Sequence, residues 1–565
     1  MARRNASLIL LGIVTPVLLA LGCAGGGEHE HDHVHTDLPR RSVPEGAGAP
    51  LFSDLGSFHR EISTRSELAQ KYFDQGLVLA YGFNHAEALR SFREASTQDP
   101  SCAICAWGEA FVLGPNINKP MDDADVPAAY EAAQRAARLS ASASPVEQAL
   151  IAAIGKRYAA APVADRKPLD LAYAAAMKDA AARFPDDVDV LALYAEAVMD
   201  TMPWDYYVDP QTPKPEAVAA FAALEKVLAR APDHVGALHF WIHAVEPSDS
   251  PDRAEAAADR LGPLSPGAGH LVHMPSHIYL RIGRYHDASR ANELAAGADE
   301  SYITQCRAQG YYPATYYPHN IHFLYASAAF EGRSAVSIAA ARKLTANITP
   351  EVVAEVPIAE EFAPIELYAL ARFGRWDDLL AAKAPPEAWR YATGAWHFGR
   401  GMAFAATGQA AAAQAELAVV RAFAAEKALR ERVFASGSRP AELLTIAGNV
   451  LEARIASEAG QWDRAVELLE TAVEQQDALP YTEPPPWYFP NREALGVALL
   501  AANRPAGAEN VFAEQLEHTP RNGWSLRGLA DSQRAQGNAE AAAETERQLA
   551  EAWSLADVQL ERATF

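Results

Sequence analysis

The sequence predicts an all-α protein built as a solenoid, in which pairs of helices stack one on the next. Two observations favour this fold. His239 and His243 recur as His273 and His277, in each case 34 residues further along the chain, and a period of that length is typical of repeated helix-turn-helix units. From about residue 55 the chain also reads as helices nearly throughout. We therefore expect no β-sheet of more than two strands.

Composition narrows the possible functions. The chain has 565 residues, with 72 acidic against 49 basic side chains and a formal net charge of −23. This balance argues against nucleic-acid binding, since no Lys/Arg cluster is available to neutralise phosphates. A chain of this length would ordinarily form several domains. Repeat proteins escape that rule because each unit buries its apolar face against its neighbours.

The first residues predict export. Two arginines precede an apolar run, Leu8 to Leu21, which is too short for a comfortable transmembrane helix. The run ends in Ala-Leu-Gly-Cys23, which resembles a bacterial lipoprotein signal, although alanine replaces the usual leucine. The resemblance implies that residues 1–22 are removed and that lipidated Cys23 anchors the chain to a membrane of the cell envelope. An ordinary signal peptide and an uncleaved anchor stay open as alternatives.

Residues 23–54 are predicted to be a disordered tether, because they contain too few apolar residues to fold. Histidines alternate with acidic residues in the first part of this tether, a composition typical of metal-binding tracts. The tether histidines are His29, His31, His33 and His35. They form either an accessory metal-capture segment or merely a solvated linker.

One segment shows the repeat most clearly. Between Tyr72 and Pro100, small residues stand where two helices would approach and large apolar residues where they would fill the gap: Gly76, Leu77, Ala88, Phe92 and Ala95. This spacing resembles the tetratricopeptide repeat (TPR) family. The resemblance implies a TPR-type α-solenoid, with one superhelix over residues 55–345 and a second over 346–565. It indicates little about function, because this fold is a scaffold with many uses.

Cys102 and Cys105 are a possible disulfide or thiol pair, because an exported protein meets oxidising conditions. The residue after Cys105 is alanine, not histidine, which excludes a c-type haem attachment site. The absence of a βαβ pattern around the pair weakens a thioredoxin-like interpretation.

Seven histidines at spacings of three or four residues are the best indication of function, because residues so spaced share one face of a helix. They are His239, His243, His270, His273, His277, His319 and His322. All stand on the first helix of their repeat units, which in the TPR family lines the concave groove. Glu196 and Glu246 are the acidic candidates beside them. We therefore expect one metal or ligand site on the concave face, with the histidines exposed in the groove.

Imidazole and carboxylate ligands suit Zn, Cu, Fe, Ni or Mn, and ligand type alone does not choose among these metals. Three functions follow as hypotheses. The first is an exported, lipid-anchored scaffold that binds a transition metal or a small ligand. The second is a metal-free scaffold that holds a protein or peptide in the concave groove. The third is a metal-dependent enzyme with Glu196 or Glu246 as base, although no common catalytic motif supports it.

Aromatic residues cluster in two predicted insertions, Trp204–Tyr207 and Tyr311–Tyr317. These segments either cover the histidine groove or fill small cores of their own.

Overall fold

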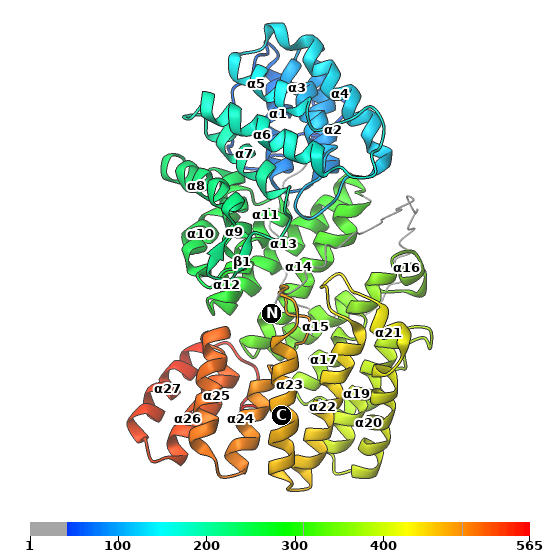
Figure 1. Cartoon of the computed structure of the whole chain (residues 1–565), viewed down its shortest axis with the longest axis vertical. Coiled ribbons are helices and arrows are strands. Elements are labelled where there is room, and N and C mark those ends of the chain that lie inside the picture. Colours follow the sequence, from blue (N-terminus) through cyan, green and yellow to red (C-terminus); the bar gives the residue numbers. More distant parts are fainter. Residues whose placement is uncertain (1–41, 309, 489, 565) are drawn as a thin grey trace. The chain divides into compact units, whose positions relative to one another are not determined.

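The computed structural model describes residues 42–308, 310–488 and 490–564. This part of the chain is helical almost throughout (Figure 1), and its sheet is a single hairpin of β1 (Tyr207–Asp209) and β2 (Thr212–Pro213). The predicted all-α, TPR-type solenoid is therefore confirmed. Within the same residues, no helix combines the length and the apolar character needed to cross a membrane.

The described residues form two compact units. Unit 1 comprises residues 42–275 and 294–317, and unit 2 comprises residues 276–293 and 318–564. The helices α12 (Pro275–Arg281), α13 (Tyr285–Cys306) and α14 (Tyr311–Phe330) each have residues in both units. Neither unit ends at residue 345, and the boundary between two superhelices expected there stays a prediction. The repeat period does not predict the division into these two units, because helix pairs on either side of it have the same sequence pattern.

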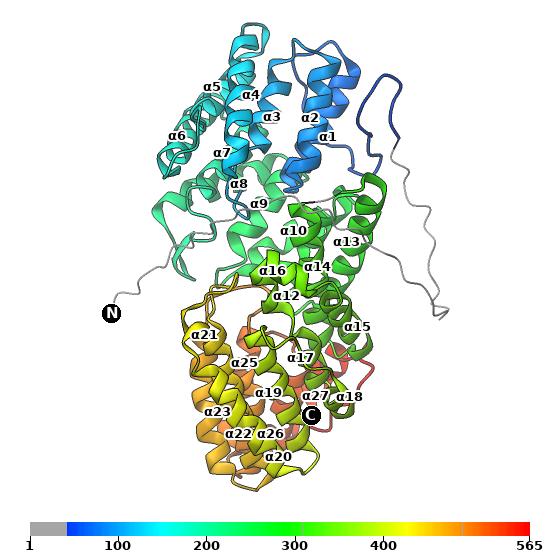
Figure 2. The ribbon, with the colours of Figure 1, turned by 90° about the vertical axis from the view of Figure 1, so that its right-hand side faces the viewer.

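In unit 1 each helix packs on the one that follows it in the chain. Figure 2 shows the same succession from the side. The helices are α1 (Glu67–Tyr81), α2 (His85–Gln98), α3 (Ala103–Val112), α4 (Val126–Leu139), α5 (Pro145–Ile154), α6 (Lys167–Arg183), α7 (Val188–Met199), α8 (Pro215–Arg230), α9 (Val235–Val245), α10 (Glu255–Leu264) and α11 (Gly269–His273).

Glycines allow the helices of a repeat to approach closely. Phe92 of α2 lies against Gly76 of α1 and Gly108 of α3, and a Cβ atom at these glycines would stand 2.8 Å and 2.3 Å from the Phe92 ring. Phe512 occupies the same place in unit 2 between Gly496 and Gly528, where a Cβ would lie 2.3 Å and 2.1 Å from its ring. A buried phenylalanine thus fills the space that two absent side chains leave on its flanking helices.

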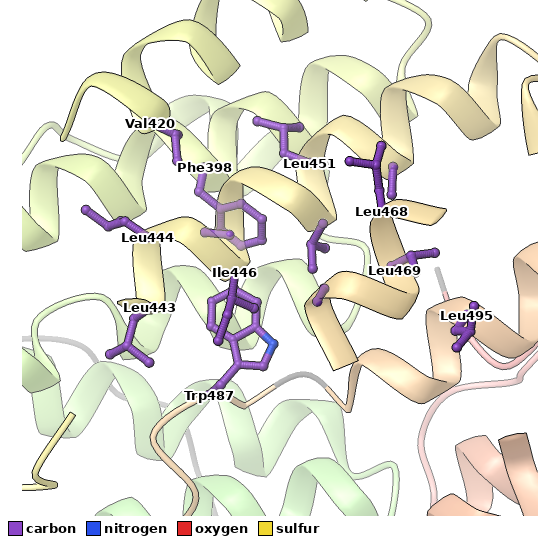
Figure 3. Packing of buried hydrophobic residues seen from close by; sticks show 14 of the residues in the cluster. Phe398, Val420, Leu443, Leu444, Ile446, Leu451, Leu468, Leu469, Trp487 and Leu495 are labelled. Carbon is purple, nitrogen blue, oxygen red and sulfur yellow. The ribbon is translucent and has the colours of Figure 1, made fainter. Parts of the chain in front are cut away.

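Unit 2 is built in the same way. Its helices beyond α14 are α15 (Ser334–Thr345), α16 (Pro350–Glu355), α17 (Ile365–Arg372), α18 (Trp376–Ala381), α19 (Arg390–Ala406), α20 (Ala410–Ala424), α21 (Lys427–Glu431), α22 (Pro440–Glu458), α23 (Trp462–Asp477), α24 (Asn491–Ala501), α25 (Pro505–His518), α26 (Gly523–Ala535) and α27 (Ala539–Ala552). Figure 3 shows part of the core between them, where Trp487 packs among leucines and Phe398. Trp487 comes from the proline-rich connection between α23 and α24, which therefore contributes to the core.

The end of the predicted tether is ordered by contacts with α1 and α2. The Tyr72 hydroxyl donates a hydrogen bond to the Ala49 carbonyl at 2.5 Å, and the Gly48 N–H donates to Glu94 at 3.0 Å. Ala49 is buried. Residues 42–54 were expected to be unfolded, and this expectation is wrong because backbone hydrogen bonds compensate for the shortage of apolar side chains.

Candidate metal centre

Helix α9, which carries His239 and His243, is held at its N-terminus by His234. The Ala237 N–H donates to His234 Nδ1 at 3.0 Å, so His234 Nε2 carries the proton that it donates to Asp189 of α7, also at 3.0 Å. Burial alone would raise the pKa of Asp189. The hydrogen bond from His234 and the charge of Arg60 outweigh burial and hold that pKa below its usual range. This hydrogen-bonded cap fixes where α9 begins.

A glycine lets α9 reach the end of α1. A Cβ at Gly236 would stand 2.5 Å from Cδ1 of Tyr81, so no larger residue would allow the two helices this approach. One turn further along α9, His239 Nδ1 donates a hydrogen bond to the Tyr81 carbonyl at 2.5 Å. The helix crossing thus sets the orientation of the His239 ring.

Three buried imidazoles converge in unit 1. His239 and His243 come from α9 and His270 from α11, and each offers a ligand nitrogen within 4.8 Å of the other two. Ring centroids are 4.7 Å apart for His239 and His243, 5.0 Å for His239 and His270, and 6.2 Å for His243 and His270. We call these three residues the triad. Helix α11 is anchored beside them by a hydrogen bond of 2.9 Å from the His270 N–H to the Tyr312 hydroxyl.

Hydrogen bonds determine which nitrogen carries the proton in two of the three rings. A carbonyl oxygen can only accept, so His239 is protonated at Nδ1 and its Nε2 bears the lone pair. His243 Nδ1 lies 3.0 Å from Glu246 Oε1 and donates to this carboxylate, which again leaves the lone pair on Nε2. Metal-binding histidines usually have this arrangement, in which the outer ring nitrogen donates to a carbonyl or carboxylate.

Phe83 packs against the whole triad. Its ring centroid lies 4.6 Å from His239, 5.9 Å from His243 and 5.5 Å from His270. The Phe83 backbone has a φ of 56°, a left-handed conformation that a bulky residue rarely adopts. The turns at Gly283 and Gly374 also have a positive φ, so this conformation belongs to the recurrent helix-pair turn. What is particular to this turn is the Phe83 ring, which contacts all three histidines of the triad.

The two predicted aromatic insertions cover the triad. Trp204 places its ring edge-on to His243 at 5.0 Å, and Tyr316 lies 4.5 Å from His270. Of the three triad histidines, none exposes more than 2% of its surface. The expectation that these histidines line an open groove is wrong, because the α1–α2 turn and both insertions close over them.

The remaining histidines of the predicted set are placed differently. His273, at the end of α11, stacks on His270 at 5.9 Å but is not part of the triad. His277 and His319 belong to unit 2, with ring centroids 5.7 Å apart. His322, also in unit 2, lies 2.8 Å from the Tyr488 hydroxyl, and burial lowers its pKa to about 3. Whether all seven histidines serve one site stays a prediction.

The two predicted acidic ligands, Glu196 and Glu246, are both buried in unit 1, and whether either binds a metal stays a prediction. Glu246 is fully buried and accepts the hydrogen bond from His243. Glu196 on α7 is in none of the groups whose ligand atoms converge among the described residues. Burial and the carboxylate of Asp200 raise the pKa of Glu196 well above its usual range, against the effect of Arg157. Asp200 pairs with Arg157 at 2.5 Å, and burial raises its pKa to about 7.

The structure joins Cys102 and Cys105 by a disulfide at the start of α3, in agreement with the expected pairing. Cys23 and the four tether histidines lie outside the described residues, and so does the predicted signal sequence of residues 1–22.

Sequence reasoning missed three groups that shape these clusters. The Tyr81 carbonyl is backbone and has no sequence signature. Phe83 stands in a short turn, where no periodicity marks it. Glu483, which lies 3.4 Å from His277, is 206 positions further along the chain within a proline-rich connection. Only the packing of distant segments brings such groups to the histidines.

No protein-family model matches the chain, and no curated protein matches it significantly. Several solved structures are similar. A human IFIT1 dimer with m7Gppp-AAAA is 11% identical, with 88% of this chain and 91% of that chain covered and a TM-score of 0.28. The APC/C hetero-tetramer Cut9–Hcn1 is 10% identical (86% and 88% covered, TM-score 0.26). Yeast Tom70 is 13% identical (88% and 93% covered, TM-score 0.26). The fold assignment rests on the helix packing described above, and similarities at these TM-scores add no conclusion about function.

Proposed function

We propose that this chain is an exported, lipid-anchored scaffold that holds a divalent transition-metal ion on His239, His243 and His270. The observation that carries the proposal is the convergence of three buried ligand nitrogens within 4.8 Å of one another. Three neutral imidazoles from two helices are a recurrent metal-binding set, because bonds of about 2.0–2.1 Å bring their nitrogens together around one ion.

The hydrogen bonds of the triad support the same proposal. His239 and His243 both direct Nδ1 to an oxygen and keep the lone pair on Nε2, the form that coordinates a metal. If these imidazoles served only as packing, nothing would require two of them to share this tautomer. Glu246 then acts as a positioning residue that holds His243 and adds negative charge near the ion.

The surroundings of Glu246 do not favour its use as a general base at the triad. The predicted general base Glu246 is fully buried and hydrogen-bonded to His243, so it is not placed to activate a water. Imidazole ligands suit Zn, Cu, Ni, Fe or Mn. The helix-pair solenoid supplies extended surfaces that suit a protein partner, and the predicted lipid anchor would keep the assembly at a membrane.

Metal content measured on matched variants tests the proposal. The full chain, with the four tether histidines replaced by asparagine, is equilibrated with Zn²⁺, and bound zinc is measured by elemental analysis. His239→Ala together with His243→Ala should lose one equivalent of zinc. His286→Ala is the matched control, because this imidazole is 54% exposed and lies in unit 2. The control should bind as much zinc as the parent chain.

Circular dichroism must show that the double variant keeps its helical content, since the substituted side chains are buried. Unchanged zinc content in a folded double variant would overturn the proposal. Zinc affinity should also fall as the pH drops below about 6.5, because a protonated imidazole is not a ligand.

A further inference from the structure

We propose that unit 2 binds an acidic peptide segment of a partner protein in a cavity that the chain itself partly fills with residues 555–564. These residues follow α27, and we call them the return segment. They belong to unit 2, whereas the triad lies in unit 1. The proposal is therefore independent of metal binding by the triad.

The return segment runs from α27 back to helices that precede it in the chain. The Asp557 carboxylate accepts hydrogen bonds from the Ser334 and Ala335 N–H groups at the start of α15, at 2.7 Å and 2.9 Å. Further along the segment, Arg527 Nη1 of α26 donates to the Leu560 carbonyl at 3.1 Å. Because the segment forms neither helix nor strand, contacts with these helices hold it in place.

The far end of the return segment forms part of the wall of a cavity. Arg562 and Thr564 line a space of about 150 Å³ together with residues of α17, α18, α19, α22, α23 and α24, among them Trp376 and Trp462. Ala563 is 1% exposed and packs in the apolar core of unit 2. An apolar cavity of about 150 Å³ can hold a benzene ring. The cavity can therefore accept a side chain in addition to those of the return segment.

The charge of Arg562 makes the return segment an imperfect occupant of this cavity. Arg562 and Arg454 of α22 line the same space, and a guanidinium group in a protein always carries its positive charge. Arg454 is only 14% exposed, and its Nε donates to Glu458 at 2.8 Å. Burial lowers the pKa of Arg454; Glu458 opposes this effect and the charge of Arg562 adds to it. The two arginines therefore repel each other across the cavity.

These contacts define the chemistry of the partner peptide. An acidic side chain in the place of Arg562 would be attracted by Arg454, whereas the return segment is repelled by it. The next residue must be small and apolar, because Ala563 is buried and a larger side chain would overfill its site. We therefore expect the partner to present an acidic residue followed by alanine or a residue of similar size. The competing interpretation is that the return segment is a permanent part of unit 2 that no peptide replaces.

Peptide binding to variants of the full chain distinguishes the two interpretations. The probe is a fluorescent synthetic peptide with the sequence of residues 554–564 and the change Arg562→Glu. Ala563→Arg in the full chain should release the return segment, because it adds bulk and a further positive charge at a buried position. Fluorescence anisotropy should show the probe binding this variant about tenfold more tightly than the parent chain, in which the attached segment competes at a high effective concentration. Gln559→Ala, at an exposed position, is the matched control and should bind the probe as the parent chain does.

Two further comparisons test the charge argument. The same peptide with Arg562 kept should bind the Ala563→Arg chain about tenfold more weakly than the probe, because Arg454 repels it. Arg454→Gln, added to the Ala563→Arg chain, should remove most of this difference between the two peptides. Arg562→Glu in the full chain should raise the melting temperature and weaken probe binding, because the attached segment then competes better.

Three outcomes would overturn the proposal. The first is that the probe fails to bind a folded Ala563→Arg chain, or binds this chain and the parent equally. The second is that the two peptides bind the Ala563→Arg chain with equal affinity, which rejects an acidic partner. Circular dichroism shows whether Ala563→Arg is folded. If it is not, the Arg562→Glu chain decides, and a melting temperature that is unchanged or lower is the third outcome against the proposal.

Discussion

At the scale of single residues, Phe83 combines an unfavourable backbone conformation with favourable tertiary contacts. Its left-handed backbone is unfavourable for a residue with a Cβ, yet its ring contacts all three histidines of the triad. Asn84, next along the chain, caps α2 by accepting a hydrogen bond from the Glu87 N–H. The turn is therefore held on one side by the cap and on the other by the triad.

Two substitutions at Phe83 distinguish the contribution of its ring to stability from the cost of its backbone conformation. Phe83→Ala should lower the free energy of unfolding by about 3–5 kcal/mol, because a buried aromatic ring is removed. Phe83→Gly loses the same ring but relieves the left-handed strain, so it should be about 1 kcal/mol more stable than Phe83→Ala. Urea denaturation of both variants measures the difference. Equal stabilities would contradict the inferred strain.

A second residue-scale prediction concerns pH. Burial lowers the pKa of His322 to about 3, whereas an unfolded histidine titrates near 6.5. Below pH 6.5 the unfolded chain binds a proton that the folded chain excludes, so stability falls as the pH drops towards 3. At pH 4.5 the loss is roughly 3 kcal/mol, at about 1.4 kcal/mol per pH unit.

His322→Phe removes this titration. The melting temperature of the variant should fall less between pH 6.5 and 4.5 than that of the parent chain. The comparison uses the slope, because loss of the contact with Tyr488 changes the baseline stability equally at both pH values. Parallel melting profiles would show that His322 takes up its proton in the folded state.

At the scale of helices, close approach at glycine is the recurrent device. The same Gly–Phe–Gly contact appears in unit 1 around Phe92 and in unit 2 around Phe512. In each case one glycine lies on the helix before the phenylalanine and the other on the helix after it. Each phenylalanine therefore packs three consecutive helices together. The spacing of small and large residues in the sequence therefore predicts how neighbouring helices pack, as well as where helices form.

Two glycine substitutions test this explanation against helix propensity. Gly108→Ala should destabilise unit 1 by about 1–3 kcal/mol, because the new Cβ would stand 2.3 Å from the Phe92 ring. Gly297→Ala is the matched control in α13, where a Cβ meets nothing within 4 Å. This control should be neutral or up to about 1 kcal/mol stabilising, since alanine favours the helix. Thermal unfolding followed by circular dichroism distinguishes the two, and equal effects would contradict the packing argument.

At the scale of the whole molecule, none of the described helices is suited to cross a membrane. The proposed membrane attachment rests on lipidated Cys23, which lies outside the described residues. Cys23→Ser should move the protein from the membrane fraction to the soluble fraction of cells, because the lipid chains are lost. Cys306→Ser is the control and should leave the protein at the membrane. Retention of the Cys23→Ser variant at the membrane would contradict a lipoprotein anchor.

By itself the sequence determined the helical solenoid and placed the histidines on particular helices, because helix periodicity and helix-pair packing are local properties. The patterns used for this prediction concern contacts within one repeat or between adjacent repeats. They are the spacing of Gly76 and Phe92 and the recurrence of His239 and His243 after 34 residues. Such a pattern cannot show that residues 42–54 pack on α1, or where the chain divides into two units.

Only the tertiary structure decided which side chains meet. The burial of the triad depends on Phe83, Trp204 and Tyr316, which come from separate loops and helices. The pairing of His277 with Glu483 joins positions 206 residues apart. Contacts of this kind depend on how distant segments pack, and no periodicity in the sequence encodes them. The chemistry proposed here rests on those contacts.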